Sequence, residues 1–312
     1  MIILTGGKTG GHIMPLIALT KKLDNVIYIG SNDSLEESLC SKHNIPFKGL
    51  PIKNNLLSMV TNFNKISINN VKCIISTGGF ISVPVLMYGI VHKIPIYLIE
   101  GNVLIGNTNK IFRTFSKKVF TAYEMEDNHK KYYLTGLPTM ISKNNKYEDS
   151  FDVLIIGGSL GSKPLCDLVY SLNDDFKIVL IAGRFLKDYQ NIKNVKVLEY
   201  HNDLTSLMRQ SKVIISRAGA MTTYEIFSIN KPCIIIPSKK TKNNHQYINA
   251  KYFEKHKLCL YLDEEEAVNL IHNTVSKLLT SEALMVNMMK NQTSIVKNNS
   301  IDLILGEIDE LH

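Results

Sequence analysis

Short apolar runs rich in β-branched and aromatic residues recur along the chain, each followed by a helix-length stretch. The runs do not alternate with polar residues, which is typical of parallel strands covered on both faces. We therefore expect twelve strands in two sets of six. In the first half they are Met1–Thr5, Val26–Gly30, Cys73–Thr77, Ile94–Ile99, Lys118–Ala122 and Tyr132–Thr135, and in the second half Val153–Ile156, Lys177–Ala182, Val195–Tyr200, Val213–Ser216, Cys233–Pro237 and Leu258–Leu262.

This repetition predicts an α/β protein of two doubly wound, Rossmann-like domains that face each other across a cleft. The length of 312 residues is enough for two domains, expected over residues 1–140 and 141–297. The polar segment Lys143–Asp149 is the expected linker. The last helical stretch, Ile301–Leu311, could pack on either domain, so residues from about 298 to 312 could return to the first.

Two glycine-rich turns follow predicted strands, Thr5–His12 in the first half and Gly157–Gly161 in the second. Glycine permits a positive φ and a close backbone approach, and a helix start offers unpaired N–H groups to an anion. Neither turn spells a Walker A loop or the dinucleotide fingerprint. Either turn, taken alone, could be a tight connection between a strand and a helix that binds no ligand. Together they favour two phosphate-binding units, suited to a nucleotide-linked donor and a phosphorylated acceptor.

Composition and charge narrow the class of protein. With 45% hydrophobic and 21% charged residues, the chain is typical of a soluble globular protein, and no apolar run reaches the roughly 18 residues of a membrane span. The five cysteines form no CxxC pair and are expected to be buried thiols in a reducing cytoplasm. Of the net charge of +8, +7 falls in residues 1–140. This half should seek a phosphate-rich surface, either nucleic acid or anionic lipid, unless its charge only aids solubility. No nucleic-acid-binding module is recognisable, so nucleic acid is not an expected partner.

A further motif, Ser216–Glu225, follows a strand and opens a helix. Gly219 allows a tight turn, and the N–H groups after it can bind a diphosphate. Glu225 lies about two turns into that helix, where its carboxylate could accept both hydroxyls of a ribose or could simply be solvated. The amides and imidazole of the segment Asn244–Ala250 suit sugar hydroxyls.

In these motifs the chain resembles the MurG family, GT-B glycosyltransferases of family 28. The resemblance runs from Ile3 to about Ala250. It implies an inverting transfer of N-acetylglucosamine (GlcNAc) from UDP-GlcNAc to the lipid-linked muramyl-pentapeptide diphosphate of peptidoglycan synthesis. It also implies a peripheral protein at the cytoplasmic face of the cell membrane. The matching motifs are Gly6–His12, Gly78–Pro84, Asn102 with Gly106, Thr108 and Asn109, Gly157–Gly161, Arg217–Glu225, and His245–Ala250.

The resemblance further implies roles for individual residues. The second domain would hold the donor, with its ribose on Glu225 and its uracil near His201. The expected donor-binding residues are Thr9, Gly10, Gly11, Asn102, Ser159, His201, Ala220, Met221, Thr222, Glu225, His245 and Gln246. The acceptor diphosphate is expected on Gly10, Gly11, Gly78, Gly79 and Phe80.

His12 is the candidate catalytic base for the acceptor hydroxyl, because imidazole titrates near neutral pH. It could equally orient its loop or bind phosphate. A positive helix end would stabilise the departing UDP. The chain has no Asp-x-Asp pair of the metal-dependent transferases, so neither a metal nor another cofactor is expected.

An apolar stripe near Lys53 and Lys65 is the candidate membrane contact. Its side chains could enter a bilayer surface while the lysines meet lipid phosphates, although core packing is an equal alternative at helical spacing. The residues are Leu56, Leu57, Met59, Val60 and Phe63.

The first half also departs from the family's pattern. Ile99–Asn102 replaces a His-Glu-Gln-Asn segment, Met140 replaces an expected Arg, Lys8 replaces a common Gly, and Pro51–Cys73 looks short by several helical turns. These changes bear on the acceptor. Two alternatives stay open: a GT-B transferase with another lipid acceptor, such as diacylglycerol or a pseudomurein precursor, or a non-catalytic membrane subunit that binds nucleotide sugar.

Overall fold

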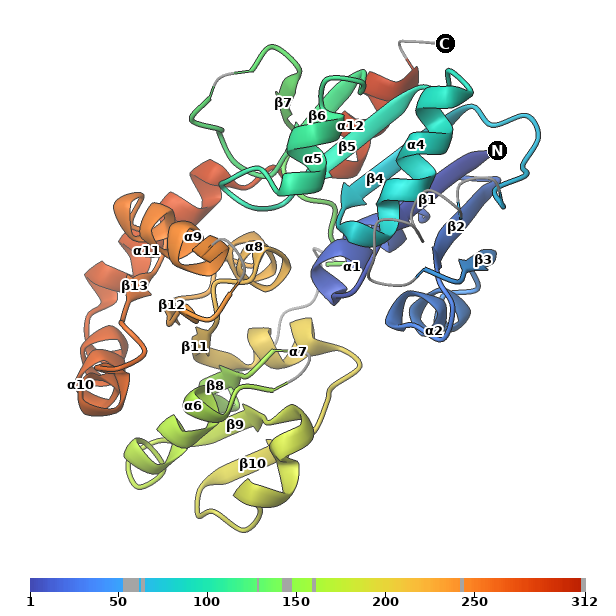
Figure 1. Cartoon of the computed structure of the whole chain (residues 1–312). Coiled ribbons are helices and arrows are strands. Elements are labelled where there is room, and N and C mark those ends of the chain that lie inside the picture. Colours follow the sequence, from blue (N-terminus) through green and yellow to red (C-terminus); the bar gives the residue numbers. More distant parts are fainter. Residues whose placement is uncertain are drawn as a thin grey trace. The chain divides into compact units, whose positions relative to one another are not determined.

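The computed structural model describes residues 1–52, 62, 65–127, 129–141, 148–158, 161–241 and 244–309. The chain divides into two compact units, Met1–Met140 with Lys297–His312, and Ile141–Val296. Each unit contains its own parallel sheet (Figure 1). The predicted α/β class with two doubly wound sheets is confirmed.

The first unit has a seven-stranded sheet in the order β3-β2-β1-β4-β5-β6-β7, with every adjacent pair parallel. The strand order reverses between β1 and β4. The strands are β1 (Ile2–Gly6), β2 (Val26–Ser31), β3 (Phe47–Leu50), β4 (Cys73–Gly78), β5 (Ile96–Glu100), β6 (Lys118–Thr121) and β7 (Tyr132–Leu134). The helices are α1 (Gly10–Leu19), α2 (Leu35–Lys42), the 3₁₀ turn η1 (Phe80–Ser82), α4 (Val83–Val91), α5 (Asn107–Phe112) and α12 (Ser300–Asp309).

Strand β3 was not predicted, so the expected set of six strands in the first half was wrong. Its four residues, Phe47-Lys48-Gly49-Leu50, include a lysine and a glycine, which are poor strand formers. It forms at the edge of the sheet, where β2 is its one partner among the described strands, and most of it is half-buried. An edge strand of this kind depends on its neighbour rather than on its own apolar pattern.

One face of this sheet packs against α4 and α5 (Figure 1). Ile74, Ile96 and Leu98 of the strands lie in one buried cluster with Leu86 of α4 and Phe112 of α5. These strand residues are almost completely buried, as expected for non-alternating runs in a covered parallel sheet.

The C-terminal helix α12 belongs to the first unit, although the second unit precedes it in the chain. Lys22 pairs with Asp302 at 2.5 Å, and Lys118 pairs with Glu307. The sequence left open whether this helix packs on the first or the second domain. In the structure it packs on the first unit.

The second unit has a six-stranded parallel sheet in the order β10-β9-β8-β11-β12-β13, which reverses between β8 and β11. All six predicted strands are present, with ends shifted by one or two residues. The strands are β8 (Phe151–Ile156), β9 (Ile178–Ile181), β10 (Val195–Leu198), β11 (Ser211–Ser216), β12 (Cys233–Ile235) and β13 (Leu260–Tyr261). The helices are α6 (Lys163–Asp167), η2 (Leu168–Ser171), η3 (Gly183–Tyr189), α7 (Leu204–Arg209), α8 (Ala220–Ser228), α9 (His245–Lys255), α10 (Ala267–Thr280) and α11 (Glu282–Ile295).

Candidate active site

The two glycine turns of the first unit follow β1 and β4, the strands between which the sheet order reverses. Such a reversal is where open α/β sheets bind ligands. The first turn enters α1 through Thr9, which has an extended backbone, and the second enters η1 and α4 through Gly79. The structure therefore brings together the residues predicted from these turns, which are Thr9, Gly10, Gly11, Gly78, Gly79 and Phe80.

His12 joins the two turns through reciprocal hydrogen bonds with Thr77. Its Nδ1 donates to the carbonyl oxygen of Thr77 at 3.0 Å, and Thr77 Oγ1 donates to the carbonyl oxygen of His12 at 2.6 Å. A carbonyl oxygen only accepts, so Nδ1 carries the proton of the neutral ring and Nε2 is the nitrogen that can take up another. The imidazole thus has the tautomer that a general base needs.

Glu100, at the end of β5, is a buried carboxylate that fixes the loop after that strand. Only 3% exposed, it accepts from the backbone and side-chain nitrogens of Asn102 through Oε1 at 3.1 and 3.0 Å, and from Gly106 N and Asn109 Nδ2 through Oε2 at 2.8 and 2.9 Å. Asn109 also abuts Gly78 (φ 78°), where a Cβ would lie 2.6 Å from Asn109 Oδ1. Glu100 therefore positions Asn102 and supports the second glycine turn.

This organising role of Glu100 was not predicted. The signal was present in the sequence, because a carboxylate closes an otherwise apolar strand, Ile96-Tyr97-Leu98-Ile99-Glu100. A charge at the end of a buried strand requires several hydrogen-bond donors to compensate its burial.

The second unit repeats the arrangement at its own reversal, between β8 and β11. Gly161 has φ 74°, and a Cβ there would lie 2.5 Å from the carbonyl oxygen of Ala182, so the turn accepts only glycine without rearrangement. Arg217, just after β11, donates to Ser162 Oγ at 2.7 Å and to the carbonyl oxygen of Ile236 at 3.0 Å, and pairs with Glu264 at 2.5 Å. Arg217, in the loop after β11, therefore ties this loop to those that follow β8, β12 and β13.

Helix α8 begins after Gly219 with its first N–H groups at this reversal, where Ala220, Met221 and Thr222 were predicted to bind a diphosphate. Glu225 lies further along α8, and desolvation raises the pKa of its carboxyl group from 4.5 to about 7. Among the described residues its carboxylate has no hydrogen-bond or ion-pair partner. A half-buried acid without a partner suits a ligand that supplies hydroxyl donors.

Helix α9 is anchored to the same edge of the sheet. Asn249, fully buried, donates to the carbonyl oxygen of Ala218 at 3.1 Å, and Gln246 Oε1 accepts from Ser238 N at 2.9 Å. His245 is the first residue of this helix. His201 lies before α7, with Nδ1 at 2.7 Å from the carbonyl oxygen of Asp203.

The predicted donor residues are thus divided between the units. Ala220, Met221, Thr222, Glu225, His245 and Gln246 belong to the second unit, as does His201, whereas Thr9, Gly10, Gly11 and Asn102 belong to the first. Ser159 and the apolar stripe of Leu56, Leu57, Met59, Val60 and Phe63 lie outside the described residues.

The described ranges of the chain contain no group of three or more His, Cys, Asp or Glu side chains placed to hold a metal ion. Nor does any helix in this part of the chain have the length and apolarity needed to cross a bilayer.

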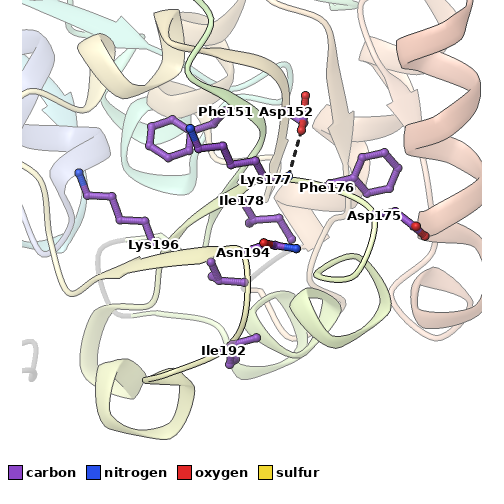
Figure 2. Close-up of a pocket in the computed structure, with 10 residues that line it drawn as sticks. Phe151, Asp152, Asp175, Phe176, Lys177, Ile178, Ile192, Asn194 and Lys196 are labelled. Atoms are coloured by element: carbon purple, nitrogen blue, oxygen red, sulfur yellow. Dashed lines mark hydrogen bonds between the residues drawn. The ribbon is translucent and has the colours of Figure 1, made fainter.

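A surface hollow of about 580 Å³ lies at the opposite edge of the second sheet, and none of the predicted site residues lines it. Figure 2 shows its lining residues, which come from the beginnings of β8, β9 and β10 and from the segments before them. Lys177 and Lys196 lie 5.5 and 6.0 Å from the ring centre of Phe151. Because ligands of open parallel sheets bind at the carboxyl ends of strands, this hollow is not the candidate active site.

Solved glycosyltransferases share this architecture. MurG of Acinetobacter baumannii matches with a TM-score of 0.81 at 20% identity, covering 99% of this chain and 98% of that one. The glycosyltransferase of kitacinnamycin matches with a TM-score of 0.70 at 12% identity, over 98% of both chains. The fold is therefore that of the GT-B glycosyltransferases.

Sequence comparison narrows this class to a family. The glycosyltransferase family 28 N-terminal domain matches residues 2–121, and the family's C-terminal domain matches residues 152–303. The chain belongs to glycosyltransferase family 28, and the predicted resemblance to MurG is confirmed.

Two relatives illustrate this resemblance over nearly the full length. One from Clostridium botulinum (strain Alaska E43 / Type E3) is 33% identical, covering 98% of this chain and 97% of the relative. One from Clostridium tetani (strain Massachusetts / E88) is 31% identical, covering 100% and 98%. Both are named UDP-N-acetylglucosamine–N-acetylmuramyl-(pentapeptide) pyrophosphoryl-undecaprenol N-acetylglucosamine transferase.

Proposed function

We propose that this chain transfers GlcNAc from UDP-GlcNAc to a lipid-linked muramyl-pentapeptide diphosphate. The observation that carries the proposal is the nearly full-length match, at 33% identity, to a relative named for that transfer. The fold alone does not identify the acceptor, because the glycosyltransferase of kitacinnamycin has the same fold, with a TM-score of 0.70.

On the donor side, the loops at the reversal of the second sheet would bind UDP-GlcNAc. The N–H groups at the start of α8 would hold its diphosphate, and the positive end of the helix would stabilise the departing UDP without a metal or another cofactor. Glu225 would accept hydrogen bonds from the ribose hydroxyls, and His201 would lie near the uracil. His245, Gln246 and Asn102 would contact the sugar.

On the acceptor side, the two glycine turns of the first unit would bind the diphosphate, and His12 would act as the base. Nε2 of His12 takes the proton of the acceptor hydroxyl, whose oxygen forms a bond to the anomeric carbon of GlcNAc. The bond from that carbon to the UDP oxygen breaks, its electron pair leaves with UDP, and the anomeric configuration inverts.

A lipid-linked acceptor lies in a membrane, so the protein must reach a membrane surface. The exposed side chains of α5 and of the loop after it suit such a contact. Ile111 and Phe115 are exposed by 64% and 56%, and they lie four residues apart near Lys110 and Lys117. Residues 101–123 contain four basic and no acidic side chains. Apolar side chains beside the exposed Lys110 and Lys117 suit the cytoplasmic face of a membrane rich in anionic lipid, where the protein would bind peripherally.

The test is transfer of labelled GlcNAc by the purified full-length chain to three acceptors. These are a polyprenyl-diphosphate muramyl-pentapeptide, a diacylglycerol and a pseudomurein precursor on the same polyprenyl diphosphate. Transfer to the first, with product of inverted configuration, is expected. Transfer only to one of the other two would overturn the acceptor assignment. UDP-GlcNAc binding without transfer to any acceptor would instead support a non-catalytic subunit.

A further inference from the structure

Lys8 has an unusual backbone conformation at the reversal of the first sheet. It lies in the first glycine turn, and its backbone φ of 75° falls in the left-handed region that residues other than glycine rarely adopt. It is exposed, and its Nζ lies 5.3 Å from the ring centre of Phe80, which follows the second glycine turn. The ammonium group of Lys8 therefore extends from one turn to the other.

The two turns that Lys8 spans adjoin the start of α1. Among the described residues, no atom would lie within 4 Å of a Cβ on Gly10, the first residue of α1. A Cβ on Gly79 would lie 3.5 Å from the carbonyl oxygen of Gly7 and 4.0 Å from Cδ2 of His12, so the second turn and the imidazole border the same small region. Lys8, the start of α1 and the candidate base His12 thus all border the two adjoining glycine turns.

We propose that Lys8 is an acceptor-binding and specificity-determining residue, whose ammonium group contacts the diphosphate of the lipid-linked acceptor. This inference rests on the proposed function. An ammonium adds a charge-assisted hydrogen bond to a phosphate oxygen and none to an uncharged headgroup. Lys8 therefore selects diphosphate-bearing lipids over neutral acceptors such as diacylglycerol.

The contact is assigned to the acceptor rather than to UDP because of its position. Lys8 and Phe80 lie in the glycine turns proposed to bind the acceptor diphosphate, whereas Glu225, proposed to bind the ribose of UDP, and the Arg217-linked loops belong to the second unit. Contact with the diphosphate of UDP is the competing outcome, and substrate kinetics distinguish the two.

The first experiment compares Lys8→Ala and Lys8→Gly with the wild-type full-length chain. Both variants should raise the KM for the polyprenyl-diphosphate acceptor about tenfold to hundredfold, with kcat and the KM for UDP-GlcNAc within about twofold. Lys8→Arg, which keeps the charge, should stay within about threefold. Lys72→Ala, which removes an exposed lysine just before β4 at the other edge of the same sheet, is the matched control.

Lys8→Gly also separates binding from folding. Glycine adopts a positive φ without strain, so this variant should melt at the same or a higher temperature while its acceptor KM rises. An unchanged acceptor KM in Lys8→Gly, or a rise confined to the KM for UDP-GlcNAc, would overturn the proposal.

A binding measurement keeps the inference testable even if the wild type transfers no sugar. Inorganic pyrophosphate is titrated into the chain with UDP at saturation, so that the nucleotide site is already occupied. Weaker pyrophosphate binding by Lys8→Ala than by the wild type and Lys72→Ala supports the contact. Equal binding by all three refutes it, whatever the outcome of the transfer assay.

Discussion

His12 and Thr77, which are 65 residues apart in sequence, hold each other by two hydrogen bonds at the reversal of the first sheet. One bond fixes the imidazole and the other fixes the backbone at the start of α1. The candidate base is therefore held by the strand end from which the second glycine turn begins. This relationship allows the catalytic role of the ring to be separated from its structural role.

His12→Asn is the substitution that makes this separation, because the asparagine amide can still donate to the Thr77 carbonyl but cannot act as a base. We expect kcat to fall by about 10²–10⁴-fold, with the melting temperature nearly unchanged. Steady-state kinetics and thermal unfolding measure the two effects. Activity close to that of the wild type would mean that His12 only orients its loop.

Glu225 should couple donor binding to a proton. Its pKa of about 7 in the free protein leaves it about half protonated at pH 7. Ribose hydroxyls that donate to the carboxylate favour its charged form, so UDP binding at pH 7 should release about half a proton. Calorimetry in buffers of different ionisation enthalpy measures this release, which should be absent in Glu225→Gln. Wild-type binding without proton release would contradict the ribose contact.

The same raised pKa should make stability depend on pH. The folded pKa of about 7 lies above the ordinary value of 4.5, so burial favours the protonated form. The contribution of Glu225 to the free energy of unfolding of the second unit should be largest below pH 4.5. It should be lost as the pH rises through 7, a fall of at most about 3 kcal/mol. Unfolding curves from pH 4 to 8 should show this fall in the wild type and a smaller one in Glu225→Gln.

Glu100→Gln should destabilise the first unit. The carboxylate accepts four hydrogen bonds, two on each oxygen, and a glutamine amide would direct its own N–H groups at two of those donors. We expect a loss of about 2–3 kcal/mol in the free energy of unfolding and a higher KM for UDP-GlcNAc through displacement of Asn102. Denaturant unfolding and kinetics measure these effects. Exposed Glu124, replaced by Gln, is the control and should change stability by less than about 0.5 kcal/mol.

Ile111→Ser combined with Phe115→Ser should weaken membrane binding about tenfold or more, because both side chains would enter the bilayer surface. Their exposure of 64% and 56% means that folding should be little affected. Sedimentation with vesicles containing anionic phospholipid measures the binding. Val286→Ser, at a residue 56% exposed in the second unit, is the control. Unchanged binding in the double variant would place the membrane contact elsewhere.

Much of the architecture could be predicted because parallel strands buried on both faces require continuous apolar runs. All twelve predicted strands formed, and each glycine turn stands at the carboxyl end of its strand. Strand β3 could not be predicted, because an edge strand with one partner can include Lys48 and Gly49. The buried hydrogen-bond network of Glu100 was equally hidden, since its donors, Asn102, Gly106 and Asn109, come from a loop without regular spacing.

The sequence by itself determined the two α/β units, the glycine turns and the family, since these follow from local spacing and ordered motifs. Only the tertiary structure decided which distant residues meet. Ser162 and Arg217, 55 residues apart, are hydrogen-bonded because β8 and β11 are neighbours where the strand order of the second sheet reverses. Lys8 reaches Phe80 because β1 and β4 are neighbours at the corresponding reversal of the first sheet. The physical reason is that strand order is set by the packing of the whole sheet, which no local pattern specifies.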